Sequence, residues 1–306
     1  MKTRETETQH GILQYELRED GVVLTGYRGK DITLVIPEYL EGIPVTVIGK
    51  KAFLGAKDLQ QLVLPESITA IQDWAFACCS ALRALVLPQK KFDTGQGILK
   101  DCIRLQQIAA VSGEGDGIAS IEALSGPEAQ RSRLLAAVMG SLDAFYLFEP
   151  LEAGSPGWLE RWDARMLSLM AQEDAEGFSK MLLCGEEDYG SRENNLDYYI
   201  EQRRRFKVRL AMLRLMNDIG LAPDVKEELL VYLRAHTKGE ASEETWKVVL
   251  EEHGDEREYY QFLLDSGCIS DGNFGAVLED MGERHTEMKA FLMNVRGAQP
   301  KMEDAF

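Results

Sequence analysis

The side chains most able to do chemistry in this chain stand in no recognised catalytic or metal-binding pattern. None of the five cysteines belongs to a CxxC pair, and no two of the four histidines have metal-ligand spacing. Gly95-Gln96-Gly97 lacks the further glycine of a dinucleotide loop, and neither a P-loop nor a GxSxG motif occurs. The sequence therefore predicts no metal, no organic cofactor and no catalytic residue.

The best candidate for an anion or partner site is a basic stripe on a long helix, predicted from about Leu196 to Asn217. Arg203, Lys207 and Arg214 share one side of this helix in a chain whose net charge is -17. Ion pairing with the surrounding carboxylates is the other interpretation of the stripe. A hydrolase or nucleotide-dependent enzyme with its site near the stripe is the alternative to a binding role, and it requires a buried acid to meet these cations in a pocket.

The elements that position such groups begin with a repeat of 23 residues. Five apolar columns recur at this interval, and each copy contains LxxLxL or a decayed form of it. The columns are Phe53/Phe76/Leu99, Ala56/Cys79/Cys102, Leu59/Leu82/Leu105, Leu62/Leu85/Ile108 and Leu64/Leu87/Ala110. Because one coil cannot bury its apolar side alone, the repeat predicts stacked coils with short strands and a shared core. Cys79 and Cys102 then stack in that core as small apolar residues.

An earlier coil and a cap precede these copies. ITLVIP at residues 32–37 matches the strand and its proline, with a return path five residues longer than in the next copy. LQYEL and VVLTGY flank an Asp20-Gly21 turn, and their alternation predicts a β-hairpin that closes the open end of the solenoid.

These segments resemble BspA-like leucine-rich repeats of bacteria over about residues 11–110. The resemblance rests on GYRGKDITLVIPEYLEGIPVTVIGKKAF and LQQLVLPESITAIQDWAFACCSALRALVLP. It implies a leucine-rich-repeat solenoid, and members of the family are often surface or secreted proteins, some of them implicated in adhesion. This chain has only about four coils, and its start, MKTRETETQHG, has no apolar export segment. We therefore expect a cytoplasmic protein; a surface or secreted protein is the alternative if a signal peptide has been removed.

The remainder of the chain is predicted to be helical. Residues 111–126 are rich in Gly and Ser and indicate a linker or capping turn, and a helical pattern follows from Pro127. A loose repeat begins near Asp174, Asp255 and Glu283, and each copy ends on a glycine: Gly185, Gly267 and Gly297. It predicts helical hairpins that resemble ankyrin repeats only vaguely. We expect an α+β protein with a solenoid at 1–110, a linker at 111–126 and an all-α domain of hairpin repeats at 127–306.

The outward side of the predicted strands carries the main functional hypothesis. The residues between the inward leucines are uncharged, although the chain is strongly charged: Thr33, Val35, Gln61, Val63, Ala84, Val86, Gln107 and Ala109. Such a face usually marks an interface, and its cover is either the helical region of the same chain, a protein partner or a second copy. The acidic charge disfavours nucleic acid, and no apolar run reaches the length of a membrane span. We therefore predict a non-enzymatic protein–protein interaction module that uses this strand face and a helical-repeat surface.

Overall fold

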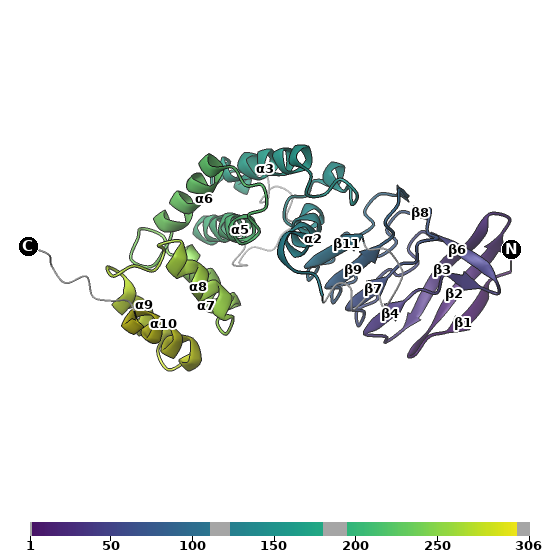
Figure 1. Ribbon diagram of the computed structural model, residues 1–306, viewed down its shortest axis with the longest axis horizontal. Helices are drawn as coiled ribbons and strands as arrows, with labels where there is room; N and C mark the ends of the chain where they lie inside the picture. The colour runs from purple at the N-terminus through teal and green to yellow at the C-terminus, as the bar shows by residue number, and fades with distance from the viewer. Residues whose placement is uncertain (1, 111–122, 180–194, 299–306) are drawn as a thin grey trace, which may run out of the picture. The chain divides into compact units, whose positions relative to one another are not determined.

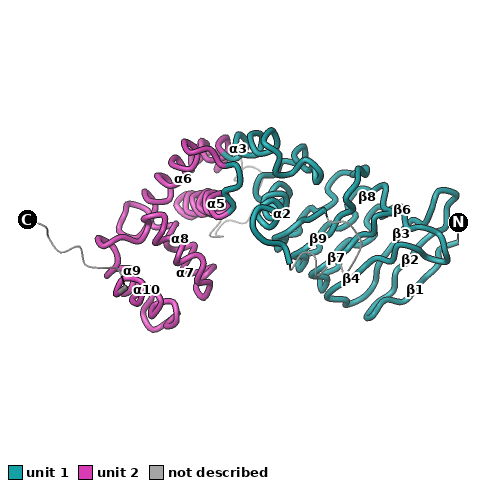
Figure 2. The backbone as a smooth tube through the Cα atoms, viewed as in Figure 1, with its two compact units in different colours: residues 1–166, 217–220 teal, residues 167–216, 221–306 magenta. Residues whose placement is uncertain are grey.

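The computed structural model describes residues 2–110, 123–179 and 195–298 of the chain (Figure 1). It divides into two compact units: residues 1–166 with 217–220, and residues 167–216 with 221–306 (Figure 2). The first unit therefore contains the coils and also the helices that directly follow them. The predicted division into a solenoid at 1–110, a linker at 111–126 and a helical domain at 127–306 stays a prediction.

Three antiparallel strands begin the first unit: β1 (Arg4–Glu7), β2 (Gly11–Arg18) and β3 (Gly21–Gly29). Strands β2 and β3 form the predicted hairpin, in which Arg18 pairs with Gly21. Gly21 has φ of +141°, a conformation that side chains rarely adopt, so the Asp-Gly turn requires its glycine. The hairpin is confirmed, and β1 is an element that the sequence pattern did not reveal.

The coils stack through a parallel sheet of four short strands, in the order β11-β9-β7-β4. These are β4 (Thr33–Val35), β7 (Gln61–Val63), β9 (Ala84–Leu87) and β11 (Gln107–Ala110). Leu62 pairs with Leu85, and Leu85 pairs with Ile108, so the 23-residue step of the sequence is the register of the sheet. These leucines and Ile108 are almost completely buried, as the solenoid core requires.

A second sheet joins the hairpin to the return paths of the coils. Strand β3 pairs in parallel with β6 (Ile43–Ile48), which is followed in the sheet by β8 (Ala70–Ile71) and β10 (Asp93–Thr94). The short strand β5 (Tyr39–Leu40) pairs with β6 inside the longer first return path. The hairpin is thus continuous with the solenoid and closes its first coil.

Helices close the other end of the coils. Helix α2 (Gly126–Met139) packs against β11, and a 3-10 turn, η1 (Phe145–Leu147), and α3 (Pro156–Met170) follow it (Figure 1). The buried Trp158 and Trp162 indoles donate hydrogen bonds to the carbonyl oxygens of Leu147 and Leu134, at 2.9 and 3.1 Å. These bonds hold α3 against η1 and α2 inside the first unit.

The second unit is helical throughout its described part. Its elements are α5 (Leu196–Met216), α6 (Pro223–Ala235), α7 (Glu244–Glu252), α8 (Arg257–Asp265), α9 (Phe274–Met281) and α10 (Thr286–Ala298). Helix α5 contacts both α6 and α7, in agreement with its two apolar stripes. None of the helices in the described ranges has a long enough apolar stretch to cross a bilayer.

The glycines predicted to end the helices of the loose repeat have different outcomes. Gly267 follows α8 with φ of +75°, as expected for a helix-ending glycine. Gly297 lies inside α10, so the prediction that it ends this helix is wrong. Gly is tolerated within a helix at a modest cost in propensity. The first copy of the repeat extends to Gly185, which lies outside the described residues.

Candidate functional site: the strand face and the cleft at its end

The eight outward residues come together on the four parallel strands in two rows. The first row is Thr33, Gln61, Ala84 and Gln107, and the second is Val35, Val63, Val86 and Ala109, each residue paired in register with the next. Within the first row, Thr33 Oγ1 donates a hydrogen bond of 3.0 Å to Gln61 Oε1. We use the name strand face for these two rows.

The second row of the strand face is buried over three coils and exposed over the first. Val63, Ala84, Val86 and Ala109 form a buried cluster, and Leu124 packs against it. Val35, in the same row as Val63, is 52% exposed. Leu124 belongs to the segment predicted as a linker or capping turn, so this part of the chain contributes to the cover. The open part of the face consists of Val35 with the half-buried Thr33 and Gln61.

The basic stripe of α5 contacts groups of its own unit. Lys207 is 4% exposed, and its Nζ lies 2.8 Å from Asp174 Oδ1. Arg203 donates a hydrogen bond to the side chain of Gln172, and Arg214 is fully buried. Burial raises the pKa of Asp174, but hydrogen bonds and charge from Lys207 and Arg204 outweigh it and hold the pKa below its usual value. These contacts favour the ion-pairing interpretation of the stripe, and an anion site there stays a prediction.

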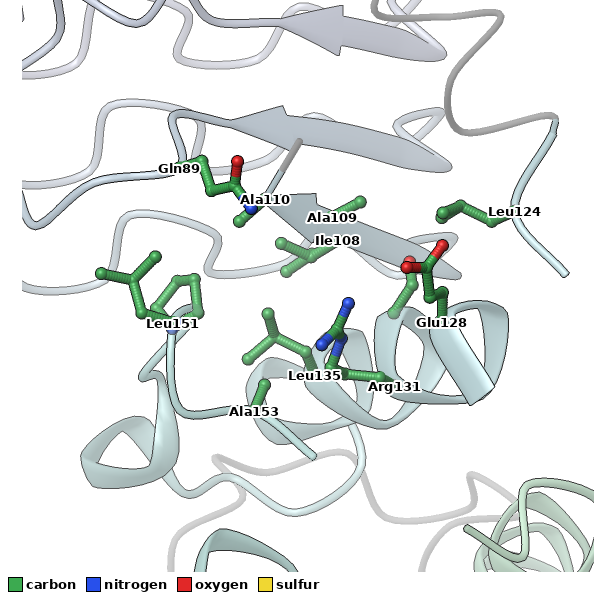
Figure 3. A pocket seen from close by; sticks show the side chains of 12 residues that line it. Gln89, Ile108, Ala109, Ala110, Leu124, Glu128, Arg131, Leu135, Leu151 and Ala153 are labelled. Atoms are coloured by element: carbon green, nitrogen blue, oxygen red, sulfur yellow. The ribbon is translucent and has the colours of Figure 1, made fainter. Parts of the chain in front are cut away.

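A cleft that the sequence did not reveal lies where the strand face ends (Figure 3). Its volume is about 190 Å³, and it lies between β11 and α2. The lining residues are Gln89, Ile108, Ala109, Ala110, Leu124, Glu128, Arg131, Ser132, Leu135, Pro150, Leu151 and Ala153. Ala109 and Leu124 belong both to the cleft and to the covered part of the strand face.

Two polar side chains of the cleft lack the partners that such groups usually have. Ser132 is 3% exposed, and its Oγ has no hydrogen-bond partner among the described residues. The guanidinium of Arg131 projects into the space between α2 and β11 (Figure 3) and forms no ion pair with any residue in the described ranges. Glu128 lies one turn earlier on the same helix. The helical period of α2 shows only that Glu128, Arg131 and Ser132 lie on one side of the helix. They line a cleft because α2 packs against β11.

The buried cysteines are structural. Cys79 Sγ lies 3.1 Å from the carbonyl oxygen of Phe53, and Cys102 Sγ lies 3.2 Å from that of Phe76, one coil further along. Both thiols are free and buried, while Cys78 is free and exposed. Cys184 lies outside the described residues. Among the residues with described side chains, no three His, Cys, Asp or Glu are placed to hold a metal ion.

Comparison with known proteins finds matches to the coils. Residues 35–119 match the family model described as BspA-type leucine-rich repeat region (6 copies). A leucine-rich repeat protein of T. pallidum is 32% identical, with a TM-score of 0.32, over 35% of this chain and 50% of its own. One from Bacteroides capillosus is 26% identical, with a TM-score of 0.31, over 36% of this chain and 86% of its own. This chain thus spans about half of the T. pallidum protein. No curated protein matches it.

Proposed function

Because residues 35–119 of this chain are a BspA-type leucine-rich repeat region, we propose that it is a non-enzymatic protein-binding module. Stacked repeats create extended surfaces on which other proteins dock. In this module the docking surface is the open part of the strand face, and the helical hairpins of the second unit offer a further surface. The partner is a protein, either a different chain or a second copy of this one.

The observation that carries this proposal is the exposure of Val35. It continues a row in which Val63 and Val86 are 8% and 3% exposed, yet its own exposed fraction is 52%. The row is uncharged in a chain with 51 acidic and 34 basic residues, so ordinary solvated surface would be expected to carry charge here. An apolar row that is covered along most of its length and open at one end is suited to a partner that continues the cover.

The test compares two apolar side chains that are about equally exposed. Leu54 is 48% exposed and does not belong to the strand face. Wild type, Val35→Glu and Leu54→Glu are immobilised and incubated with extract of the source organism, and each is also examined by light scattering for self-association. We expect wild type and Leu54→Glu to retain the same protein, or the same dimer, and Val35→Glu to lose it. Equal retention by all three would overturn the proposal.

A further inference from the structure

We infer that the cleft between α2 and β11 binds a carboxylate carried on a short apolar group. Its lining includes two donors from the same helix, the Arg131 guanidinium and the Ser132 hydroxyl. A guanidinium matches a carboxylate with two parallel hydrogen bonds, and a serine hydroxyl can donate a third. This site is separate from the open part of the strand face, so either proposal can fail without the other.

Ser132 supports a ligand because its hydroxyl is buried and has no hydrogen-bond partner in the described parts of the chain. Other buried positions of the same helix hold alanine, as at Ala129, Ala136 and Ala137. A hydroxyl removed from water without a partner destabilises the fold, whereas alanine at that position would not. An acceptor inside the cleft would satisfy this hydroxyl. A ligand oxygen supplies such an acceptor.

Arg131 supports an anion because its guanidinium lines the cleft and is not held by a carboxylate of the described residues. Arg205 and Arg209 lie within 2.7 Å of Glu251 and Glu252, respectively. In a chain with 17 more acidic than basic residues, Arg131 has no such contact in the described parts of the chain. Its charge is therefore available to a ligand that enters the cleft.

The walls of the cleft set the size of the group that carries the carboxylate. Leu135, Leu151 and Ala110 give it apolar sides (Figure 3). Its 190 Å³ equals the liquid volume of about six water molecules, which fits one apolar amino-acid residue. The carboxylate then comes either from the last residue of a peptide or from a free amino acid. Glu128 distinguishes the two sources, because only the free amino acid brings an ammonium group to pair with it.

In the experiment, each of three probes is titrated into the full chain, and binding is measured by NMR or calorimetry. The probes are acetyl-glycyl-leucine, the C-terminal amide of the same peptide, and free leucine. We expect at least one of the two probes with a free carboxylate, acetyl-glycyl-leucine or leucine, to bind with a Kd of about 1 mM or below. The amide should not bind. Tighter binding of the acetylated peptide assigns the site to peptide termini, and tighter binding of free leucine, weakened in Glu128→Gln, assigns it to amino acids.

Variants test the named groups. Arg131→Met is expected to weaken binding by about tenfold to a hundredfold, the range for a hydrogen bond to a charged group. Arg133→Met is the matched control, because Arg133 lies on the same helix but outside the cleft, near Asn217. Ser132→Ala should weaken binding several-fold without lowering the melting temperature. Absence of binding by both acids, equal binding of the amide, or an Arg131→Met variant that binds like wild type would overturn the inference.

Discussion

Tyr27 of the hairpin stacks on Phe53 of the first return path, with the ring centroids 5.4 Å apart. Phe53 in turn contacts Phe76, one coil further, at 5.6 Å. The Tyr27 hydroxyl donates a hydrogen bond of 2.8 Å to Asp31, a carboxylate that is only 1% exposed. The aromatic column of Phe53 and Phe76 is therefore joined to the hairpin cap through the ring of Tyr27, which the buried Asp31 holds by a hydrogen bond.

The environment of Asp31 predicts that the folded protein loses stability in acid. Burial raises the pKa of Asp31, but hydrogen bonds from Thr8, Tyr27 and the His10 backbone outweigh it, and the pKa lies below its usual value. A carboxylate with a lower pKa when folded stabilises the protein above its unfolded pKa of about 3.9. This contribution is lost as the pH falls through the folded pKa.

We expect Asp31→Asn to lower the free energy of unfolding by about 1–3 kcal/mol at neutral pH, because the amide cannot accept all of these bonds. The variant should also show a flatter pH dependence than wild type below about pH 5. Urea unfolding at a series of pH values measures both effects. Asp20→Asn, at the exposed hairpin turn, is the control. A pH dependence of Asp31→Asn identical to that of wild type would contradict the assignment.

Two backbone positions in each coil have positive φ. The first position is occupied by Lys51, Trp74 and Gly97, with φ of 59°, 61° and 59°. The second is occupied by Gly55, Cys78 and Asp101, with φ of 72°, 60° and 60°. We expect Gly55→Ala to destabilise the protein by about 1–2 kcal/mol, the cost of the left-handed conformation for a residue with a Cβ. Apart from its two chain neighbours, no described residue has an atom within 4 Å of the added carbon, so the cost is conformational.

Gly157→Ala is the matched control, since Gly157 lies in the first turn of α3, has no positive φ and also has no neighbour within 4 Å. It should leave stability unchanged or raise it, because alanine favours the helix. Chemical denaturation of both variants gives the comparison. A Gly55→Ala variant as stable as Gly157→Ala would show that the coil accepts another backbone conformation.

The thiols of the solenoid core should be protected from reagents. Contact with Cys79, together with burial, raises the pKa of the Cys102 thiol, and burial raises that of Cys268. Because the thiolate is the reactive form, Cys102 and Cys268 should react slowly in the native protein. Contact with Cys102 lowers the pKa of Cys79, so the slow reaction expected of Cys79 rests on the complete burial of its side chain. In a Cys184→Ser background, thiol titration should show Cys78 reacting at once and the buried thiols only after denaturation. Prompt reaction of Cys79 and Cys102 would contradict the stacked core.

The repeat could be predicted because its spacing is also the sheet register. Leu62, Leu85 and Ile108 are 23 residues apart and pair directly across the strands, so the linear pattern contains the three-dimensional one. Strand β1 has no apolar alternation, since Arg4–Glu7 reads RETE, and its pairing with β2 gives it its structure. The local sequence pattern therefore identifies the coils, but it misses β1, which is a strand because it pairs with β2.

The candidate sites depend on tertiary contacts that no local pattern contains. The strand face could be located from the period of two, but its burial depends on Leu124, which lies in a segment whose composition indicates only a linker. The cleft likewise requires α2 to pack on β11. Ser132 and Arg131 have no motif spacing, so nothing in the sequence marks them before that contact is known.

The two ends of the strand face should respond differently to charge. Val63→Glu combined with Val86→Glu places two carboxylates in the buried cluster, and each must then be desolvated or protonated. We expect the melting temperature to fall by many degrees, since changes of this kind remove a large part of a domain's stability. Val35→Glu, which adds a charge at an exposed position, should change it little. Equal melting temperatures for the double variant and wild type would show that the face is not covered.

The most direct test of the protein-binding account places a photo-reactive amino acid at position 35 of the full chain in cells of the source organism. The same amino acid at position 54 is the control, because both sites are about half exposed and only Val35 belongs to the strand face. The account predicts a covalent adduct with one defined protein, or with a second copy of the chain, from position 35 and not from position 54. No adduct from position 35, or the same diffuse adducts from both positions, would contradict it.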